Sequence, residues 1–245
     1  MGDLPQGLGA RARCAADSTV FPACAEGTDC AIAIGMNRLS ARLVQATEVE
    51  RSRLLPGDHL IPKPSGVLTH AITVNCSRRE LWPWLIQMGA DRAGWYSYDA
   101  LDNGGRRSAG EILRDFQNPP VGAVFPALPG RRDGFVLIER DPPNQLVLGW
   151  PSPTGGQMVT WAFVLDEVEP SVTRLLVRAR ASADYRFHHL PNTIGLWLAQ
   201  VVHFIMERKQ LVEVARRAER RMQTEGMVVG VELSTGWGLQ TCKEP

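Results

Sequence analysis

The sequence predicts an α+β fold in which an antiparallel sheet packs against one long C-terminal helix. Residues 121–181 contain several short segments with the alternation or apolar runs of strands, and residues 192–223 form one uninterrupted helical pattern. The breaks between the strand segments are short enough for hairpins, which join antiparallel strands. Such a sheet buries one face, and only the long helix can cover it.

The predicted C-terminal helix changes character along its length. Residues 192–206 contain no Asp, Glu, Lys or Arg, whereas residues 207–223 are rich in Glu and Arg. Apolar residues recur at three- and four-residue steps, which predicts a face that packs on the sheet. The uncharged half is shorter than the roughly 18 residues that a membrane span needs. Asn192 or Thr193 can start this helix, and Gly226 is placed to end it.

Composition bounds the class of protein. The 245 residues are 44% hydrophobic, which is enough for one sizeable domain with tails. A net charge of +1 gives no electrostatic reason to expect a nucleic-acid partner or an anionic membrane partner. Because the uncharged half of the helix is too short to span a bilayer, we also expect no stable membrane insertion. The 5 cysteines form no C-x-x-C pair, so neither a disulfide framework nor a zinc site is indicated. With no signal peptide evident, we expect a cytoplasmic protein.

The chain is predicted to divide into three parts. Residues 1–53 form an extension that is disordered or partly helical, since residues 1–35 lack periodicity and residues 37–53 form a short amphipathic segment. Met36 is an alternative start to Met1. Residues 54–225 form the folded domain, and residues 226–245 form a C-terminal tail.

The elements of the folded domain are predicted in order. Residues 70–74 alternate like a strand, and Ser77 with Glu80 forms a capping box for the helix that follows. Pro83 indicates that this helix begins near Leu81 or bends. A second short helix or turn at residues 95–103 and a polar connection at 104–118 come next. The later strands are predicted at residues 124–128, 135–139, 146–150, 159–165 and 174–181. The arginines of the last strand, Arg174, Arg178 and Arg180, are expected on a solvated face.

This order of elements resembles the helix-grip fold, in which a curved antiparallel sheet wraps around a long C-terminal helix. Four segments are most characteristic: residues 55–58 (LPGD), 82–89 (WPWLIQMG), 94–99 (GWYSYD) and 203–209 (HFIMERK). They resemble the START-like SRPBCC superfamily, and within it the bacterial polyketide cyclase/dehydrase and lipid-transport branch. The resemblance covers residues 54–221 and implies a deep apolar cavity between sheet and helix. It does not fix an activity, because the superfamily includes carriers, receptors and cyclases.

Aromatic and sulfur-containing side chains are the candidates to line that cavity. Trp161 alternates in phase with Phe163, so it should face inward, and Trp150 ends its strand near a rim. Methionines suit an adaptable wall. Residues 95–99 have a second interpretation, a packed corner in which Asp99 is a local cap. The candidate ligand-binding residues are Met88, Trp95, Tyr96, Tyr98, Trp150, Trp161, Phe163, His203 and Met206.

Acid–base candidates are few. His203 and Glu207 lie four residues apart on one helix face, where they can poise a general base or form a structural pair. Tyr98 and Asp99 complete the catalytic candidates. No ligand cluster indicates a metal, and no nucleotide or cofactor fingerprint is present, so we expect no cofactor.

Three functions remain open on the sequence alone. The first is binding of a hydrophobic small molecule, lipid-like, polyketide-like or aromatic, by a carrier or sensor. The second is a cyclase or dehydratase that acts on a polyketide-like substrate in the same cavity. The third, an interaction scaffold, requires that side chains fill the cavity.

Overall fold

The computed structural model describes residues 44–185 and 192–235 of the chain. The chain divides into two units, residues 1–37 and 38–245, and every described residue belongs to the second. The segment predicted to be disordered, residues 1–35, lies outside the described residues, as does the end of the predicted tail. The three-part division itself stays a prediction.

Six strands form one antiparallel sheet in the order β1-β6-β5-β4-β3-β2. The predicted strands are confirmed to within a few residues at most ends, and the chain's first strand pairs with its last, Ala71 opposite Leu176. The hairpin connections between β2 and β6 produce the antiparallel order that the short breaks predicted. The strands are β1 (Gly66–Val74), β2 (Val124–Pro126), β3 (Gly134–Asp141), β4 (Gln145–Pro151), β5 (Gln157–Glu169) and β6 (Val172–Ala181).

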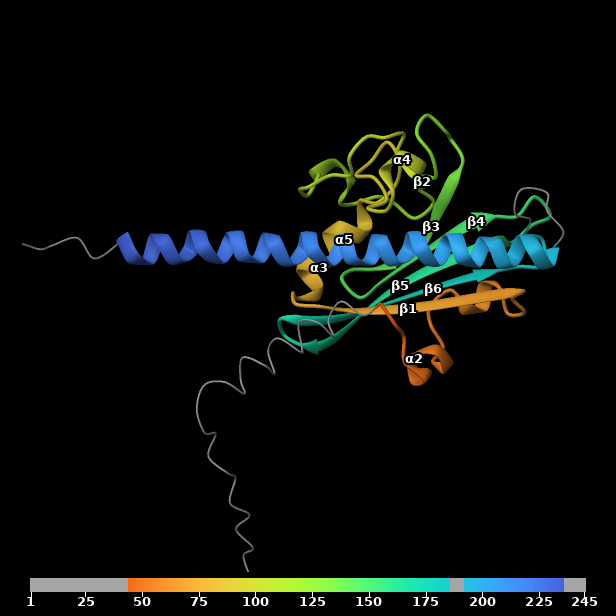
Figure 1. Ribbon diagram of the computed structural model, residues 1–245, viewed down its shortest axis with the longest axis horizontal. Helices are drawn as coiled ribbons and strands as arrows, with labels where there is room; N and C mark the ends of the chain where they lie inside the picture. Colours follow the sequence, from red (N-terminus) through yellow and green to blue (C-terminus); the bar gives the residue numbers. More distant parts are fainter. Residues whose placement is uncertain (1–43, 186–191, 236–245) are drawn as a thin grey trace, which may run out of the picture. The chain divides into compact units, whose positions relative to one another are not determined.

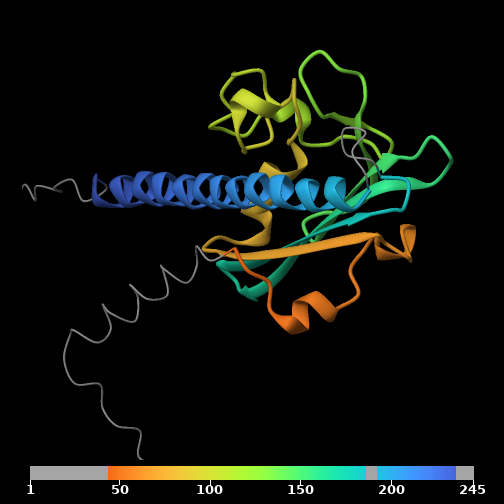
Figure 2. The same ribbon diagram turned by 45° about the vertical axis from the view of Figure 1, so that its right-hand side comes forward.

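The long helix α5 (Asn192–Thr235) runs across the inner face of this sheet, as both views show (Figures 1 and 2). Its buried residues follow the predicted helical spacing, with Leu211, Val214 and Ala218 in the core. The prediction that Gly226 ends the helix is wrong. A glycine inside a helix costs only about 1 kcal/mol, and no proline follows it closely enough to stop the helix. Within the described ranges, no helix combines the length and apolar character that crossing a membrane requires.

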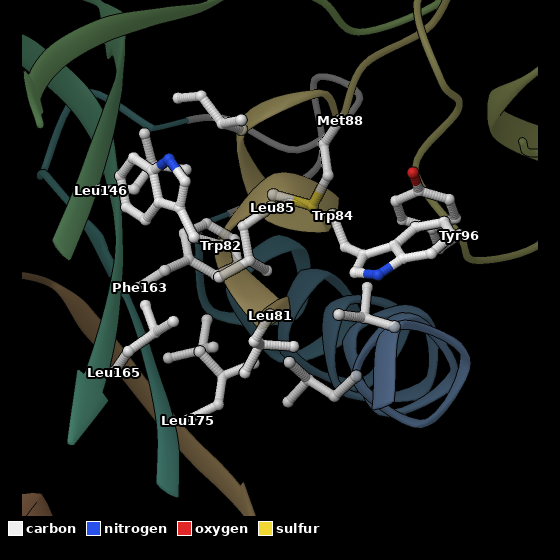
Figure 3. Close-up of a cluster of buried hydrophobic side chains, with 14 of the residues drawn as sticks. Leu81, Trp82, Trp84, Leu85, Met88, Tyr96, Leu146, Phe163, Leu165 and Leu175 are labelled. Carbon is white, nitrogen blue, oxygen red and sulfur yellow. The ribbon is translucent and has the colours of Figure 1, made fainter. Parts of the chain in front are cut away.

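Helix α3 (Arg78–Ile86) completes the core beside α5 (Figure 3). The capping box is confirmed: the Glu80 carboxylate accepts hydrogen bonds from the Ser77 backbone N–H at 2.8 Å and the Ser77 hydroxyl at 2.7 Å. The helix therefore begins at Arg78, not near Leu81, and it contains Pro83. Leu81, Trp82 and Leu85 face strand residues such as Phe163 in Figure 3, while Trp84 lies against Tyr96.

The outer face of the sheet is covered, so the prediction of a solvated arginine face is wrong. Arg178 is only 4% exposed, and it donates hydrogen bonds to the Asp58 carboxylate at 2.7 Å and to the carbonyls of Glu50, Arg51 and Arg53. Arg174 pairs with Glu50, and Arg180 donates to the carbonyl of Ile61. Helix α2 (Glu48–Ser52) and the short turn η1 (Asp58–Leu60) supply several of these acceptors.

A small second apolar cluster lies under this cover. It consists of Ala46, Leu55, Ala71, Val164 and Leu176. Leu176 lies on the same face of β6 as Arg174 and Arg178, so the outer face makes apolar as well as charged contacts. Residues 44–53 thus contact the sheet ahead of Leu54, where the folded domain was predicted to begin.

Candidate functional site

A pocket of about 180 Å³ lies between the inner face of the sheet and α5. This volume is close to that of a cavity that holds benzene, about 150 Å³, and below the roughly 300 to 1,000 Å³ of pockets for drug-sized ligands. The pocket is therefore smaller than the deep cavity that the resemblance implied. Its lining residues are Trp95, Ser97, Asp102, Ala127, Phe135, Trp161, His203, Met206, Glu207 and Gln210.

Three aromatic rings form the apolar wall. Trp161 of β5 stacks on Trp95 with 5.7 Å between ring centroids, and Phe135 of β3 lies 5.3 Å from Trp161. Trp161 faces inward, as its alternation with Phe163 predicted. Across the sheet it is opposite Ala179, whose small side chain leaves room for the indole. The wall is held in place because the Trp95 indole N–H donates to the carbonyls of Pro126 and Ala127, both at 3.2 Å.

The backbone at Tyr96 lets neighbouring residues reach the pocket together. Tyr96 has φ of 58°, a left-handed conformation that non-glycine residues adopt rarely. Trp95 and Ser97 both line the pocket, whereas the Tyr96 ring packs away from it, edge-on to Trp84 and under the Arg217 guanidinium. The short helix or turn predicted at residues 95–103 is thus a turn at Tyr96 followed by the short helix α4 (Asp99–Asp102).

Helix α5 holds the same segment with two hydrogen bonds. The Gln210 side-chain amide donates to the Trp95 carbonyl at 2.9 Å, and the Ser97 hydroxyl donates to the Met206 carbonyl at 3.0 Å. Gly94, with φ of 81°, precedes the segment, and a Cβ at this position would lie 2.3 Å from the Ser108 hydroxyl oxygen. The glycine of the G-W-Y-S-Y-D segment therefore lets the backbone at residue 94 pack closely against Ser108.

Glu207 is a fully buried carboxylate with several partners. It accepts a hydrogen bond from the Trp161 indole N–H at 2.9 Å and is hydrogen-bonded to His70 Nδ1 of β1. His203 Nε2 lies 3.4 Å from the Glu207 carboxylate in an ion pair. Burial raises the pKa of Glu207, but the charges and hydrogen bonds of His203 and His70 outweigh it and hold the pKa at about 2. Burial lowers the pKa of His203, and Glu207 more than offsets this, so that pKa lies above its ordinary value.

Asp102 is a second buried carboxylate in the pocket, and its situation is the opposite. The residue is 6% exposed, and neither carboxylate oxygen has a hydrogen-bond partner in the described structure. Burial, and secondarily the charge of Asp99, raise the pKa of Asp102 to about 6. A carboxyl group with a pKa this close to neutrality is available as an acid, a base or a ligand contact. In the sequence, Asp102 has the three-residue spacing from Asp99 that is typical of a polar helix face, which gives no sign of its burial.

The predicted site residues are distributed unevenly about the pocket. Trp95, Trp161, His203, Met206 and Glu207 line it, and Trp150 lies edge-on to Phe135 with 5.3 Å between centroids. Met88, Tyr96 and Phe163 are buried in the adjoining core. The Tyr98 side chain is exposed, and Asp99 accepts hydrogen bonds from the Ser108 hydroxyl at 2.6 Å and backbone N–H at 3.1 Å, which is the local structural role considered from the sequence.

Other pocket residues were not predicted. Ser97, Asp102, Ala127, Phe135 and Gln210 line the pocket, and His70 completes the Glu207 network. Phe135 had a detectable signal, because it begins a predicted strand and points to the same face as Leu137. Across residues 44–185 and 192–235, no three His, Cys, Asp or Glu side chains are grouped as metal ligands.

Comparisons with known proteins give structural matches only. The sequence matches no family model, and no match to a curated protein was found. Similar solved structures include the ZhuI aromatase/cyclase of Streptomyces sp. R1128, at 12% identity and a TM-score of 0.34, over 64% of this chain and 95% of that chain. Another is the self-sacrificing resistance protein CalC of Micromonospora echinospora, at 13% identity and a TM-score of 0.32, over 65% and 96%. A third is a polyketide-cyclase-like protein of Corynebacterium glutamicum, at 12% identity and a TM-score of 0.30, over 71% and 97%.

The fold itself is established by the arrangement of this chain's own elements. One six-stranded antiparallel sheet, two helical segments after its first strand and a long C-terminal helix across its inner face are the components of a helix grip. The chain thus has a helix-grip fold, as the predicted order of its elements implied.

Proposed function

We propose that this protein binds a small aromatic or otherwise hydrophobic molecule in the pocket, as a carrier or sensor. One observation carries the proposal: Trp95, Phe135 and Trp161 form an aromatic wall beside a small set of polar atoms, at the interface of sheet and helix. An apolar pocket with few convergent polar groups is the usual form of a small-molecule site. The wall supplies affinity, and the polar atoms supply orientation.

The pocket's size narrows the ligand class. A volume of about 180 Å³ accommodates one or two rings with a short substituent. The two indole N–H groups of the wall are already engaged, that of Trp95 by backbone carbonyls and that of Trp161 by Glu207. These bonds resist outward movement of the rings. A compact aromatic molecule therefore fits better than a long acyl chain or a multi-ring polyketide.

A second candidate function is acid–base catalysis on such a molecule, of the cyclase or dehydratase type. It is supported by Asp102 and His203, because a carboxyl group with a pKa of about 6 and an imidazole line the same pocket. Of the four catalytic candidates from the sequence, His203 and Glu207 reach the pocket, while Tyr98 and Asp99 are not among its lining residues. Glu207 is held by partners, so Asp102 takes the place of Asp99 in this hypothesis.

Calorimetric titration with a series of small aromatic compounds tests the binding proposal. We expect saturable binding at one site. Trp161→Phe should weaken this binding, because a phenyl ring offers the ligand less contact surface than the indole. Trp84→Phe is the matched control: it makes the same change in the core, outside the pocket, at an indole N–H that has no hydrogen-bond partner in the described structure. Equal weakening by both variants, or no saturable binding to the folded wild-type protein, would contradict the proposal.

A further inference from the structure

We propose that the ligand of this pocket carries a protonated amine next to its aromatic body, and that the Asp102 carboxylate binds this ammonium group. The inference deepens the proposed function and rests on it. It assigns a binding role to a residue that the sequence pattern places on a polar helix face. The chemistry of the ligand is inferred from the polar atoms of the pocket that have no hydrogen-bond partner.

The unmatched polar atoms of the pocket are mainly acceptors. Both carboxylate oxygens of Asp102 and the side-chain carbonyl of Gln210 are buried without a hydrogen-bond partner in the described structure. The Gln210 amide nitrogen is already engaged by the Trp95 carbonyl. The His203 Nε2 atom is already paired with the Glu207 carboxylate, 3.4 Å away. A ligand that satisfies this pocket must therefore bring hydrogen-bond donors.

Glu207 is a buried carboxylate with a structural role in the same pocket, and its partners can be compared with those of Asp102. Two histidines and one indole N–H surround it, and together they supply charge and donors. Asp102 lines the same pocket and is almost as deeply buried, yet within the described residues it has none of these partners. A buried carboxylate without a partner is costly to a folded protein. This contrast indicates that the partner of Asp102 arrives with the ligand.

The missing partner is better supplied by a cation than by a hydroxyl group. The described lining residues include no lysine or arginine. The other titratable lining residues are His203 and Glu207 on α5, and Asp99 acts on Asp102 from its own helix. An ammonium group supplies both a positive charge and three donors, whereas a hydroxyl supplies one donor without charge. The faces of the aromatic wall also attract cations. The geometry thus favours an aromatic amine of one or two rings.

The test is a calorimetric titration of the full-length protein with four compounds that share one phenyl ring: 2-phenylethylamine, 2-phenylethanol, ethylbenzene and 3-phenylpropionate. At about pH 8, an acid with a pKa of about 6 is ionised. We expect the amine to bind about tenfold or more tightly than the alcohol or ethylbenzene, since a charge-assisted hydrogen bond is added. The carboxylate compound should bind most weakly.

Variants assign the preference to Asp102. Asp102→Asn keeps the shape and removes the charge, so the amine should lose its advantage while ethylbenzene binds as before. Asp115→Asn is the control, because Asp115 is exposed and lies outside the pocket. It removes the same charge and should leave the preference intact. A melting curve for each variant checks that it is folded.

The outcomes separate this inference from the proposed function. Equal affinity for the amine, the alcohol and ethylbenzene would overturn the inference and leave the pocket's binding function standing. An amine preference that survives Asp102→Asn would overturn the role of Asp102. Absence of binding by all four compounds to the folded protein would overturn the inference together with the proposed function.

Discussion

Asp102 and Glu207 line one pocket, but in the described structure only Glu207 has hydrogen-bond partners for its carboxylate. Asp102→Asn should therefore stabilise the protein at neutral pH, on the order of 2 kcal/mol, because it removes an uncompensated buried charge. The folded-state pKa of about 6 lies above the ordinary 3.8. The protonated form thus favours folding at low pH, and this contribution is lost as the pH rises from about 3.8 through about 6.

Urea unfolding of the wild type and Asp102→Asn checks this at about pH 4 and about pH 8. The two proteins should have similar free energies of unfolding at the lower pH and diverge at the higher one. Asp115→Asn should follow the wild type at both. A loss of stability in Asp102→Asn at about pH 8 would mean that the carboxylate is a structural contact, which contradicts the role of ligand partner proposed for it.

Glu207→Gln should have the opposite effect. The substitution leaves His203 without its buried counter-charge and His70 without its carboxylate partner, and breaking a buried pair in this way costs about 3 to 5 kcal/mol. Glu213→Gln is the control on the same helix, since Glu213 pairs with Lys209 and Arg217 at a half-buried position. Its loss should be about 1 kcal/mol or less. The free energies of unfolding are measured by urea unfolding. If the two variants lose equal amounts, the Glu207 network does not stabilise the packing of the helix on the sheet.

Ala127→Leu should fill part of the pocket without removing any core side chain. Ala127 lines the pocket and is half-buried, so added methyl groups occupy space that the ligand would take. We expect ethylbenzene affinity to fall about tenfold or more, since a steric block removes the apolar contact. Ala123→Leu makes the same change outside the pocket and should leave affinity unchanged. Undiminished binding by a folded Ala127→Leu protein would place the ligand elsewhere.

Arg178→Met should release the segment that covers the outer face of the sheet. Arg178 donates to Asp58 and to the carbonyls of Arg51 and Arg53, so its loss leaves several buried acceptors unsatisfied. Trypsin should then cleave after Arg51 or Arg53 faster than in the wild type, while the exposed-site variant Arg216→Met should not change this rate. Unchanged cleavage in Arg178→Met would show that the segment is held by other contacts.

The fold followed from the sequence where one local pattern determines one local structure. Period-two alternation in β5 predicted the direction of Trp161, and Ser77 with Glu80 marked the start of α3 through its orphan N–H groups. The outer face was misjudged because arginines that alternate along a strand have the same pattern whether water or Asp58 receives them. Only the tertiary position of residues 44–61 distinguishes these two environments.

The site was only partly predictable for the same reason. The His203–Glu207 pair lies within one helix and was visible as a four-residue spacing. The contact between His70 and Glu207 joins residues 137 positions apart, and no local pattern encodes it. Asp102 was not among the predicted site residues, because its three-residue spacing from Asp99 does not indicate which carboxylate is covered. The left-handed backbone at Tyr96, which orients this segment, also leaves no sign in a one-dimensional pattern.

Ligand binding in the aromatic pocket is observed most directly by NMR of the indole N–H signals during titration with a small aromatic compound such as ethylbenzene. We expect saturable shifts for Trp95 and Trp161, which line the pocket, and unchanged signals for Trp82 and Trp84, which lie in the core outside it. Trp161→Phe assigns its own signal by removing it. Shifts confined to Trp82 and Trp84, or no saturable shift of any indole signal in the folded protein, would contradict the claim that this pocket binds an aromatic ligand.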